Sequence, residues 1–152
     1  MKVGGKVADF SLAATGGADF RLEDMAGKKL VIYFYPKDMT AGCTRESQDF
    51  RDLHAAFRKA GVRIVGVSRD SLASHEKFKA RDKLPFELLA DEDSKACKLF
   101  DVIHEKSMYG RKYLGLVRST FLLDGTAVLR QEWRNVKVPG HVEEVLEAAL
   151  CL

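Results

Sequence analysis

The chain has 152 residues, of which 46% are hydrophobic and 31% are charged, and its formal net charge is +3. This length fits one domain with a substantial core, and the composition is typical of globular proteins. The small, scattered positive charge argues against nucleic-acid binding, and no apolar stretch is long enough to span a membrane. Because the N-terminus MKVGGKVADF lacks the apolar core of a signal peptide, we expect one domain over residues 1–152 in the cytoplasm.

The first half of the chain predicts alternating strands and helices. Residues 8–24 indicate a small hairpin around a glycine pair. Residues 30–36, LVIYFYP, form a continuous apolar run that suits a strand buried on both faces. Residues 43–61 place apolar side chains at helical spacing and end in a glycine, which predicts a helix. Residues 62–68, VRIVGVS, predict a second buried strand.

The second half continues this alternation. A polar helix capped by Asp70 or Ser71 follows the second strand, and residues 85–91 predict a short strand. Residues 91–103 then favour a helix. A hairpin turns at Asp124-Gly125, and a final helix covers the last residues of the chain. This order indicates an α/β sandwich with a mixed central sheet flanked by helices and an N-terminal hairpin, and a thioredoxin-like fold is the leading candidate.

Three cysteines, Cys43, Cys97 and Cys151, are an odd number, which argues against a disulfide framework. No CxxC or CxxH pair is present, so we expect no metal site, and no motif indicates a cofactor. Reduced thiols in a reducing compartment are therefore the expectation.

The segment PKDMTAGCT, residues 36–44, joins the first long strand to the next helix and carries Cys43. Ser47 and Phe50 share a helix face with this cysteine, so its thiol is expected to point inward. The unpaired amides of a helix N-terminus favour the thiolate, which is the nucleophilic form. Thr40 adds a hydroxyl that can accept and donate a hydrogen bond.

Further residues are candidates for the same site. Gly42 lets backbone amides approach a bound oxygen, and Pro36 removes an amide and shields one side of the thiol. A cation is still needed, and Arg118 fits if the fold type brings it across the sheet end from the first long strand. Taken alone, Cys43 would more often be a buried structural thiol.

Pro36, Thr40 and Cys43 match the Pro-x-x-x-Thr-x-x-Cys signature of peroxiredoxins, and PKDMTAGCTRE resembles the bacterioferritin comigratory protein (PrxQ) subfamily. ADFSL, GVS, CKLFDV and EKSMYGRKYLGLVRSTFLL extend the resemblance over the whole chain. The resemblance implies a thioredoxin-like peroxidase that reduces hydrogen peroxide and organic hydroperoxides. It also implies that Cys43 is the peroxidatic nucleophile, that Thr40 and Arg118 activate the peroxide, and that Pro36 shapes the pocket. Ala41 stands where the subfamily usually has proline.

The subfamily resemblance places a resolving cysteine at one of two positions, which hold Gln48 and Lys79 in this chain. Cys97 is interpreted as a half-buried packing thiol, and Cys151 lies one residue from the C-terminus. We therefore expect a one-cysteine mechanism, in which thioredoxin, glutaredoxin or glutathione reduces oxidised Cys43, and the subfamily resemblance implies a monomer. Resolution by Cys97 and a redox sensor without turnover stay open as alternatives.

Two other thiol functions fit the sequence less well. A dithiol oxidoreductase needs a CxxC pair at the helix start, and a cysteine phosphatase needs an arginine six residues after the cysteine, where Asp49 stands. The histidines sit among polar or charged neighbours, and all four are predicted to lie on the surface: His54, His75, His104 and His141.

Overall fold

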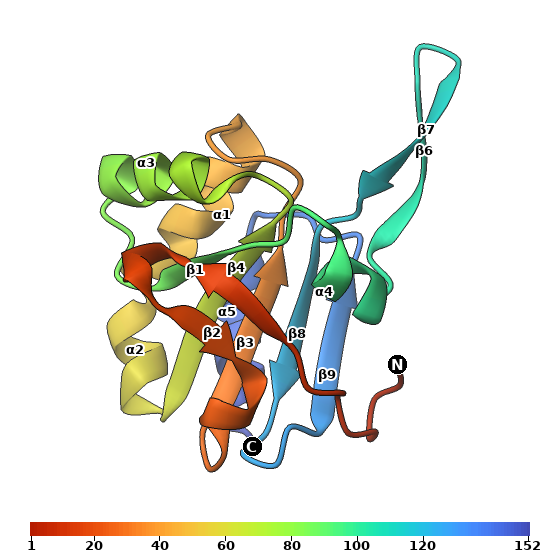
Figure 1. Cartoon of the computed structure of the whole chain (residues 1–152). Helices are drawn as coiled ribbons and strands as arrows, with labels where there is room; N and C mark the ends of the chain where they lie inside the picture. The colour runs from red at the N-terminus through yellow and green to blue at the C-terminus, as the bar shows by residue number, and fades with distance from the viewer.

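The computed structural model describes residues 1–152, and a seven-stranded sheet forms its centre (Figure 1). The strands of this sheet are β1 Ser11–Ala14, β2 Asp19–Arg21, β3 Lys29–Phe34, β4 Val62–Ser68, β5 Glu87–Ala90, β8 Ser119–Leu123 and β9 Leu129–Arg134. Their order across the sheet is β2-β1-β5-β4-β3-β8-β9. β3, β4 and β5 run parallel, and every other neighbouring pair is antiparallel, so the sheet is mixed as predicted.

The helices cover both faces of the sheet. They are α1 Ala41–Asp52, α2 His54–Lys59, α3 Leu72–Asp82, α4 Lys95–Leu99 and α5 His141–Leu150, with short 3-10 turns at Thr15–Gly17 and Leu22–Met25. One apolar cluster joins α1, α2, α3 and α5 to the sheet, and a second joins α4 and the N-terminal segment to the opposite face. No helix is long and apolar enough to cross a membrane.

The central strands β3 and β4 form where the apolar runs predict them, and their packing depends on one glycine. Every residue of β3 after Lys29 is buried. Tyr33 of β3 pairs with Gly66 of β4, and a Cβ atom on Gly66 would lie 2.7 Å from the Tyr33 ring. Gly66 therefore makes room for the Tyr33 ring.

Several predicted elements are confirmed, and two differ. The N-terminal hairpin, the hairpin at Asp124-Gly125 and the Ser71 cap of α3 are present. The helix predicted over residues 43–61 is two helices, because the chain leaves helical geometry at Leu53. The predicted helix over residues 91–103 is shorter and forms only α4.

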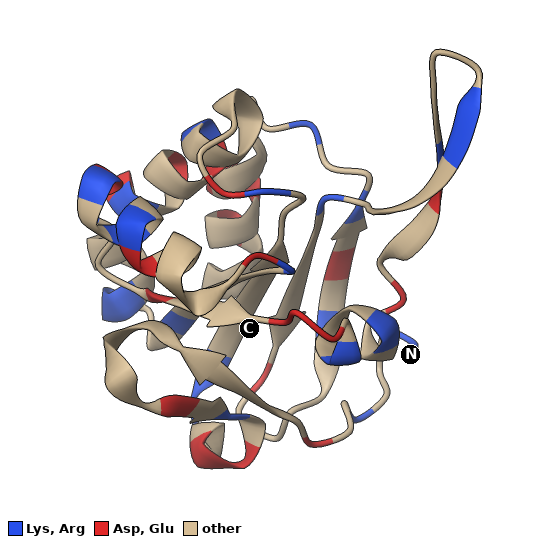
Figure 2. Cartoon of the chain, turned by 45° about the horizontal axis from the view of Figure 1, so that its top comes forward, with Lys and Arg blue, Asp and Glu red and all other residues tan.

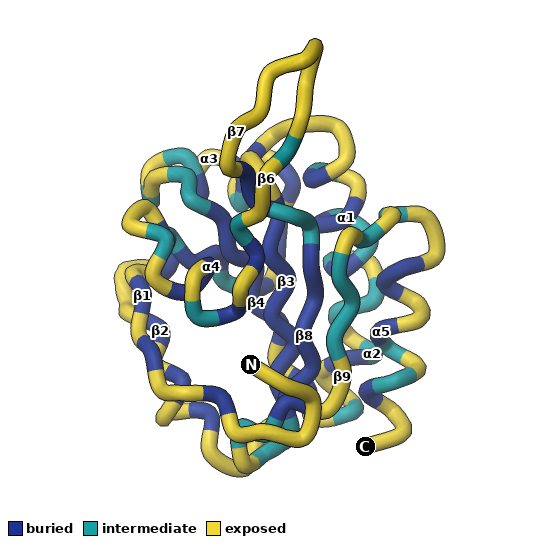
Figure 3. The backbone as a smooth tube through the Cα atoms, turned by 90° about the vertical axis from the view of Figure 1, so that its right-hand side faces the viewer, coloured by how far each residue is buried: buried dark blue, intermediate teal, exposed yellow.

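A second, two-stranded sheet projects from the body and was not predicted. It consists of β6 Ile103–Met108 and β7 Arg111–Leu116, joined at Tyr109 and Gly110. Figure 3 shows this arm as largely exposed, whereas the central strands of the main sheet are buried. Acidic and basic residues are interspersed over the whole chain, including this arm (Figure 2).

Candidate active site

The loop between β3 and α1 places Cys43 in the first turn of α1, as the sequence predicts. Thr40 is the N-cap residue, and Cys43 is the third residue of the helix. The thiol points inward, since Cys43 is only 1% exposed. Ser47 and Phe50 are buried on the same face, and the Ser47 hydroxyl shares a hydrogen bond of 2.9 Å with the Tyr33 hydroxyl. This helix face therefore holds the thiol against the sheet.

Arg118 brings a positive charge to the thiol from the neighbouring strand. It lies directly before β8, and Ser119 pairs with Phe34 at the end of β3, so the side chain reaches the start of α1. Nη2 of Arg118 donates a hydrogen bond to Sγ of Cys43 at 3.2 Å. Burial works against the charge, but the nearby acidic groups of Glu46 and Cys43 raise the pKa of Arg118. The guanidinium therefore stays charged beside the sulfur.

Glu46 belongs to this cluster and was not predicted from the sequence. Its side chain is fully buried, and its Oε1 accepts a hydrogen bond from Nη1 of Arg118 at 2.7 Å. Burial raises the pKa of Glu46 to about 7, although the charge of Arg118 acts in the opposite direction. Oε2 has no hydrogen-bond partner. Because Glu46 lies three residues after Cys43, helical spacing was the signal that could have identified it.

Gly42 gives the guanidinium its space. A Cβ atom at this position would lie 3.1 Å from Nη2 of Arg118, the same nitrogen that bonds the sulfur of Cys43. Such an approach is tighter than most real Cβ contacts. A side chain at this position would therefore require Nη2 of Arg118 to shift by a few tenths of an ångström.

Pro36 and Thr40 lie on the exposed rim of the site. The Thr40 hydroxyl donates a hydrogen bond to the carbonyl of Lys37 at 2.8 Å, so toward a ligand its oxygen can act only as an acceptor. The first helical hydrogen bond runs from the amide of Thr44 to the carbonyl of Thr40, and no side chain caps α1. The amides of residues 41–43 therefore lack helical acceptors and can serve a bound polar oxygen.

Comparison with known proteins identifies the family. Residues 3–132 match the AhpC/TSA family. Peroxiredoxin Bcp of Xanthomonas campestris is 51% identical over 92% of this chain and 88% of its own length. Peroxiredoxin Bcp of Bacillus subtilis is 47% identical over 97% of this chain and 94% of its own length. The chain belongs to the AhpC/TSA family, in its Bcp (PrxQ) branch.

A solved relative supports both the fold and the enzyme class of this peroxiredoxin. The structure of the X. campestris bacterioferritin comigratory protein has a TM-score of 0.90 and 49% identity, covering 93% of this chain and 90% of that one. That protein is described by its alkyl peroxide reduction activity. The thioredoxin-like fold is thereby confirmed, and the chain is a peroxidase among the oxidoreductases.

The two other thiols of the peroxiredoxin lie away from Cys43. Cys97 is fully buried on the opposite face of the sheet, whereas a half-buried position was predicted. Burial, followed by hydrogen bonding to Asp91 and its charge, raises the pKa of Cys97 far above its usual range. Cys151 is exposed after α5, and the C-terminal carbonyl next to it accepts a hydrogen bond from Lys29 at the start of β3. Cys43 lies beyond the other end of that strand, about 20 Å away.

The two positions at which the subfamily resemblance places a resolving cysteine have other partners here. Gln48 donates a hydrogen bond from Nε2 to Oδ1 of Asp82 at 3.0 Å. Lys79 forms an ion pair with Glu87 at 2.9 Å. Both side chains therefore tie α1 and α3 into the surrounding structure.

The prediction of four surface histidines is wrong for two of them. His75 is fully buried, and its ring nitrogens lie beside the Asp38 carboxylate and the Leu89 carbonyl. His141 is 5% exposed and hydrogen-bonds the Thr120 hydroxyl at 2.8 Å. Both residues lie on helices rich in charged side chains, and this local composition concealed their buried faces.

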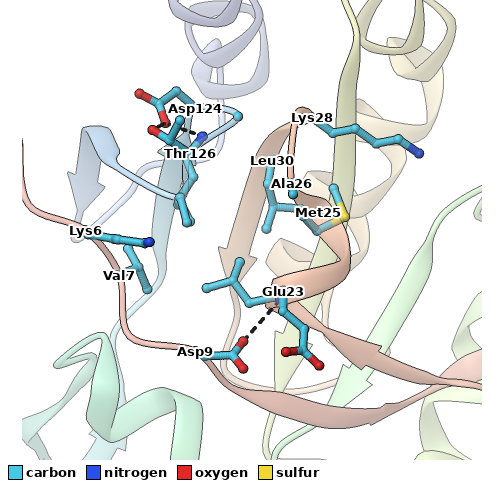
Figure 4. A pocket seen from close by; sticks show the side chains of 14 residues that line it. Lys6, Val7, Asp9, Glu23, Met25, Ala26, Lys28, Leu30, Asp124 and Thr126 are labelled. Atoms are coloured by element: carbon cyan, nitrogen blue, oxygen red, sulfur yellow. Dashed lines mark hydrogen bonds between the residues drawn. The ribbon is translucent and has the colours of Figure 1, made fainter.

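A cavity of about 550 Å³ opens at the far end of the sheet from Cys43 (Figure 4). Leu30 at the start of β3 forms part of its wall, together with the turn that follows β8. Lys6, Asp9 and Glu23 add mixed charges around it, and no cysteine lines it. The cavity therefore has no part in chemistry at Cys43.

Proposed function

We propose that Cys43 is the peroxidatic nucleophile and that it is oxidised to a sulfenic acid by hydrogen peroxide or an organic hydroperoxide. The observation that carries this assignment is the hydrogen bond of 3.2 Å from Arg118 to its sulfur. A guanidinium at this distance stabilises a thiolate, which is the reactive form of cysteine. The alkyl peroxide reduction described for the X. campestris relative supports the same substrate class.

In the oxidative step, the Cys43 thiolate attacks the terminal oxygen of the hydroperoxide in line with the O–O bond. An S–O bond forms, the O–O bond breaks, and the other oxygen leaves as an alkoxide or hydroxide that takes up a proton. Arg118 lies where it can stabilise the charge that develops on the leaving oxygen. Cys43 is left as a sulfenic acid, and one alcohol or water is released.

Thr40 and the free amides of α1 orient the peroxide for this attack. Because the Thr40 hydroxyl gives its only proton to the carbonyl of Lys37, its oxygen accepts the hydrogen of the peroxide. The amides of residues 41–43 donate in the opposite sense, toward oxygen lone pairs. Pro36 forms the rim of the pocket and offers no competing amide. These contacts hold the terminal oxygen in front of the sulfur.

The distribution of cysteines supports an external thiol for the second half of the cycle. A disulfide needs two Cα atoms within about 7 Å. Cys97 lies on the opposite face of the sheet from Cys43, and Cys151 lies near the start of β3. A thiol of thioredoxin, glutaredoxin or glutathione would condense with the sulfenic acid and release water. A second thiol would then break the mixed disulfide and restore Cys43.

Oxidation by one equivalent of peroxide, followed by disulfide mapping with mass spectrometry, tests this proposal. We expect a sulfenic acid on Cys43 in a monomeric protein and no disulfide to Cys97 or Cys151. Excess peroxide should then be consumed only when a thiol reductant is supplied, and comparing thioredoxin, glutaredoxin and glutathione identifies that reductant. A Cys43–Cys97 disulfide formed as fast as turnover would establish the two-cysteine alternative. Rapid oxidation without turnover on any reductant would indicate a redox sensor.

A further inference from the structure

The loop that carries the pocket is held in a strained conformation. Met39, between the strand and α1, has a φ of +62°, in the left-handed region that a non-glycine residue rarely adopts. Such a conformation persists only where the surrounding contacts fix the chain on both sides. Met39 directly precedes Thr40, so whatever fixes this residue also fixes the hydroxyl at the pocket rim.

Asp38 is the residue that anchors this loop. It is 4% exposed, and its Oδ1 accepts a hydrogen bond from the Tyr35 hydroxyl at 2.6 Å. Its Oδ2 accepts from the Ser74 hydroxyl at 2.8 Å and lies 2.7 Å from Nδ1 of His75. Its backbone amide donates to the carboxylate of Asp70 at 2.8 Å. Four partners thus hold one loop residue, two of them from consecutive positions of α3.

The partners of His75 connect the loop to β5. Nδ1 faces the Asp38 carboxylate, and Nε2 lies 2.9 Å from the carbonyl oxygen of Leu89 in β5. Burial works against ionisation of Asp38, but hydrogen bonds from His75 and Tyr35 outweigh it and lower the pKa of this carboxyl. Asp38 and His75 therefore form a fully buried hydrogen-bonded pair that joins the loop to α3 and β5.

The same side chains do not favour a metal ion. Asp38, Asp70 and His75 could bring ligand atoms within 4.8 Å of one another. However, Nδ1 of His75 already shares a hydrogen bond with the carboxylate of Asp38, and Asp70 accepts from the amide of Asp38 and the hydroxyl of Ser68. Hydrogen bonds thus account for the cluster.

We propose that Asp38 and His75 are positioning residues for the peroxidase reaction, because their buried hydrogen bond locks the strained loop to α3 and β5 and thereby sets Thr40 and the first turn of α1 against the sulfur of Cys43. This inference rests on the proposed role of Cys43. A second connection between Asp38 and α1 supports the inference. The Tyr35 ring, whose hydroxyl donates to Asp38, stacks on the Tyr33 ring, and the Tyr33 hydroxyl shares a hydrogen bond with Ser47 of α1.

Two substitutions of His75 test its contact to Asp38 separately from its contact to Leu89. In H75N the amide nitrogen occupies the position of Nδ1, so the contact to Asp38 is kept and that to Leu89 is lost. In H75Q the amide nitrogen occupies the position of Nε2, so the contact to Leu89 is kept and that to Asp38 is lost. We expect the rate constant for oxidation of Cys43 by hydrogen peroxide to fall about tenfold or more in H75Q, because misplaced catalytic groups cost this much or more. In H75N it should stay close to the wild-type value.

Hydrogen exchange and a destabilised control complete the test. H75Q should exchange the amides of residues 39–44 faster than H75N, whereas Phe20→Leu, a core substitution in β2 within the other apolar cluster, should destabilise the protein without changing either readout. Equal rate constants and equal exchange in H75N and H75Q would overturn the inference. If wild-type protein and Cys43→Ser react alike with peroxide, the proposed function fails instead, so the two failures are distinguishable.

Discussion

Two buried thiols on opposite faces of one sheet have opposite electrostatic surroundings. Cys43 and Cys97 are each at most 1% exposed, so access to solvent does not distinguish them. Cys43 accepts a hydrogen bond from the guanidinium of Arg118, whereas burial, and after it the hydrogen bond and charge of the neighbouring Asp91, raise the pKa of the Cys97 thiol. The nearest charged group is thus a cation at Cys43 and a carboxylate at Cys97.

The N-terminal ends of the two helices that carry these thiols also differ, because their backbone amides are free in α1 and occupied in α4. The amides of Ala96 and Cys97 at the start of α4 both donate to the carboxylate of Asp91, at 3.1 and 2.8 Å. The start of α1 has no side-chain cap, so its amides stay available beside Cys43. A helix N-terminus favours an anion only while its amides are free, and in α4 a carboxylate already occupies them.

Replacing each thiol in turn should give the largest difference in peroxidase turnover. Cys43→Ser should reduce peroxidase turnover to background, because a serine hydroxyl is not ionised at neutral pH. Cys97→Ala should retain turnover and lose only about 1 kcal/mol of stability from the small cavity that it leaves. Consumption of peroxide with a thiol reductant, followed beside urea unfolding, measures both. Loss of turnover in Cys97→Ala with oxidation of Cys43 intact would show that Cys97 resolves the sulfenic acid.

Removing the cation should have the next largest effect. Arg118→Met keeps much of the side-chain volume but leaves Cys43 without its charged donor, so the rate constant for oxidation by peroxide should fall roughly 100-fold or more. Arg134→Met is the matched control, because Arg134 is also partly buried, donates to the carbonyls of Phe100 and Asp101 and pairs with Glu132, away from Cys43. Stopped-flow oxidation of both variants tests this. A similar loss in the two variants would assign the effect to stability and not to charge at the sulfur.

A methyl group at position 42 should lower the rate of reaction with peroxide without lowering the stability of the protein. Gly42→Ala forces Arg118 away from a Cβ atom that would lie at 3.1 Å, and we expect a loss of about tenfold in the peroxide rate constant. The same change favours the helix by up to about 1 kcal/mol, so the unfolding midpoint should rise or stay the same. Ala41→Gly is the control, because it lowers helix propensity at the adjacent residue without crowding Arg118. A rate constant unchanged in Gly42→Ala would show that the guanidinium can move freely.

The elements that position Cys43 could be predicted because their signals are local. The apolar runs of β3 and β4 and the spacing of Cys43, Ser47 and Phe50 on one helix face need no tertiary information. Arg118 was reached only through the fold type and the family resemblance, because the pairing of Ser119 with Phe34 connects segments far apart in the sequence.

The polar network behind the loop could not be predicted in the same way. Asp38 and His75 are 37 residues apart, and only the packing of α3 against the sheet brings them together. His75 does share a buried face with Phe78 three residues later, which was the available signal. The arm of β6 and β7 gave no alternation of apolar residues, because it projects into solvent and buries neither face along most of its length.

The smallest expected effect concerns Glu46 and the pH dependence of stability. Burial raises the pKa of Glu46 from 4.5 to about 7, so the folded protein binds this proton more tightly than the unfolded chain does. The free energy of unfolding should therefore fall as pH rises from about 4.5 to about 7, and level off above that range. Glu46→Gln removes the titrating group and should flatten this part of the profile. Urea unfolding at a series of pH values measures the difference between the two proteins.

The Glu46→Gln experiment has a matched control, and it also tests whether the charge of Glu46 is needed to hold Arg118 at Cys43. Glu132→Gln changes the same chemical group on β9, away from Arg118, and should leave the fall between about pH 4.5 and 7 in place. Since glutamine can still accept the hydrogen bond from Arg118, the guanidinium should stay beside Cys43, and oxidation by peroxide should continue. A profile of Glu46→Gln that falls as steeply as the wild type would place the titrating group elsewhere. Loss of oxidation in this variant would instead show that the carboxylate charge itself holds Arg118 at the sulfur.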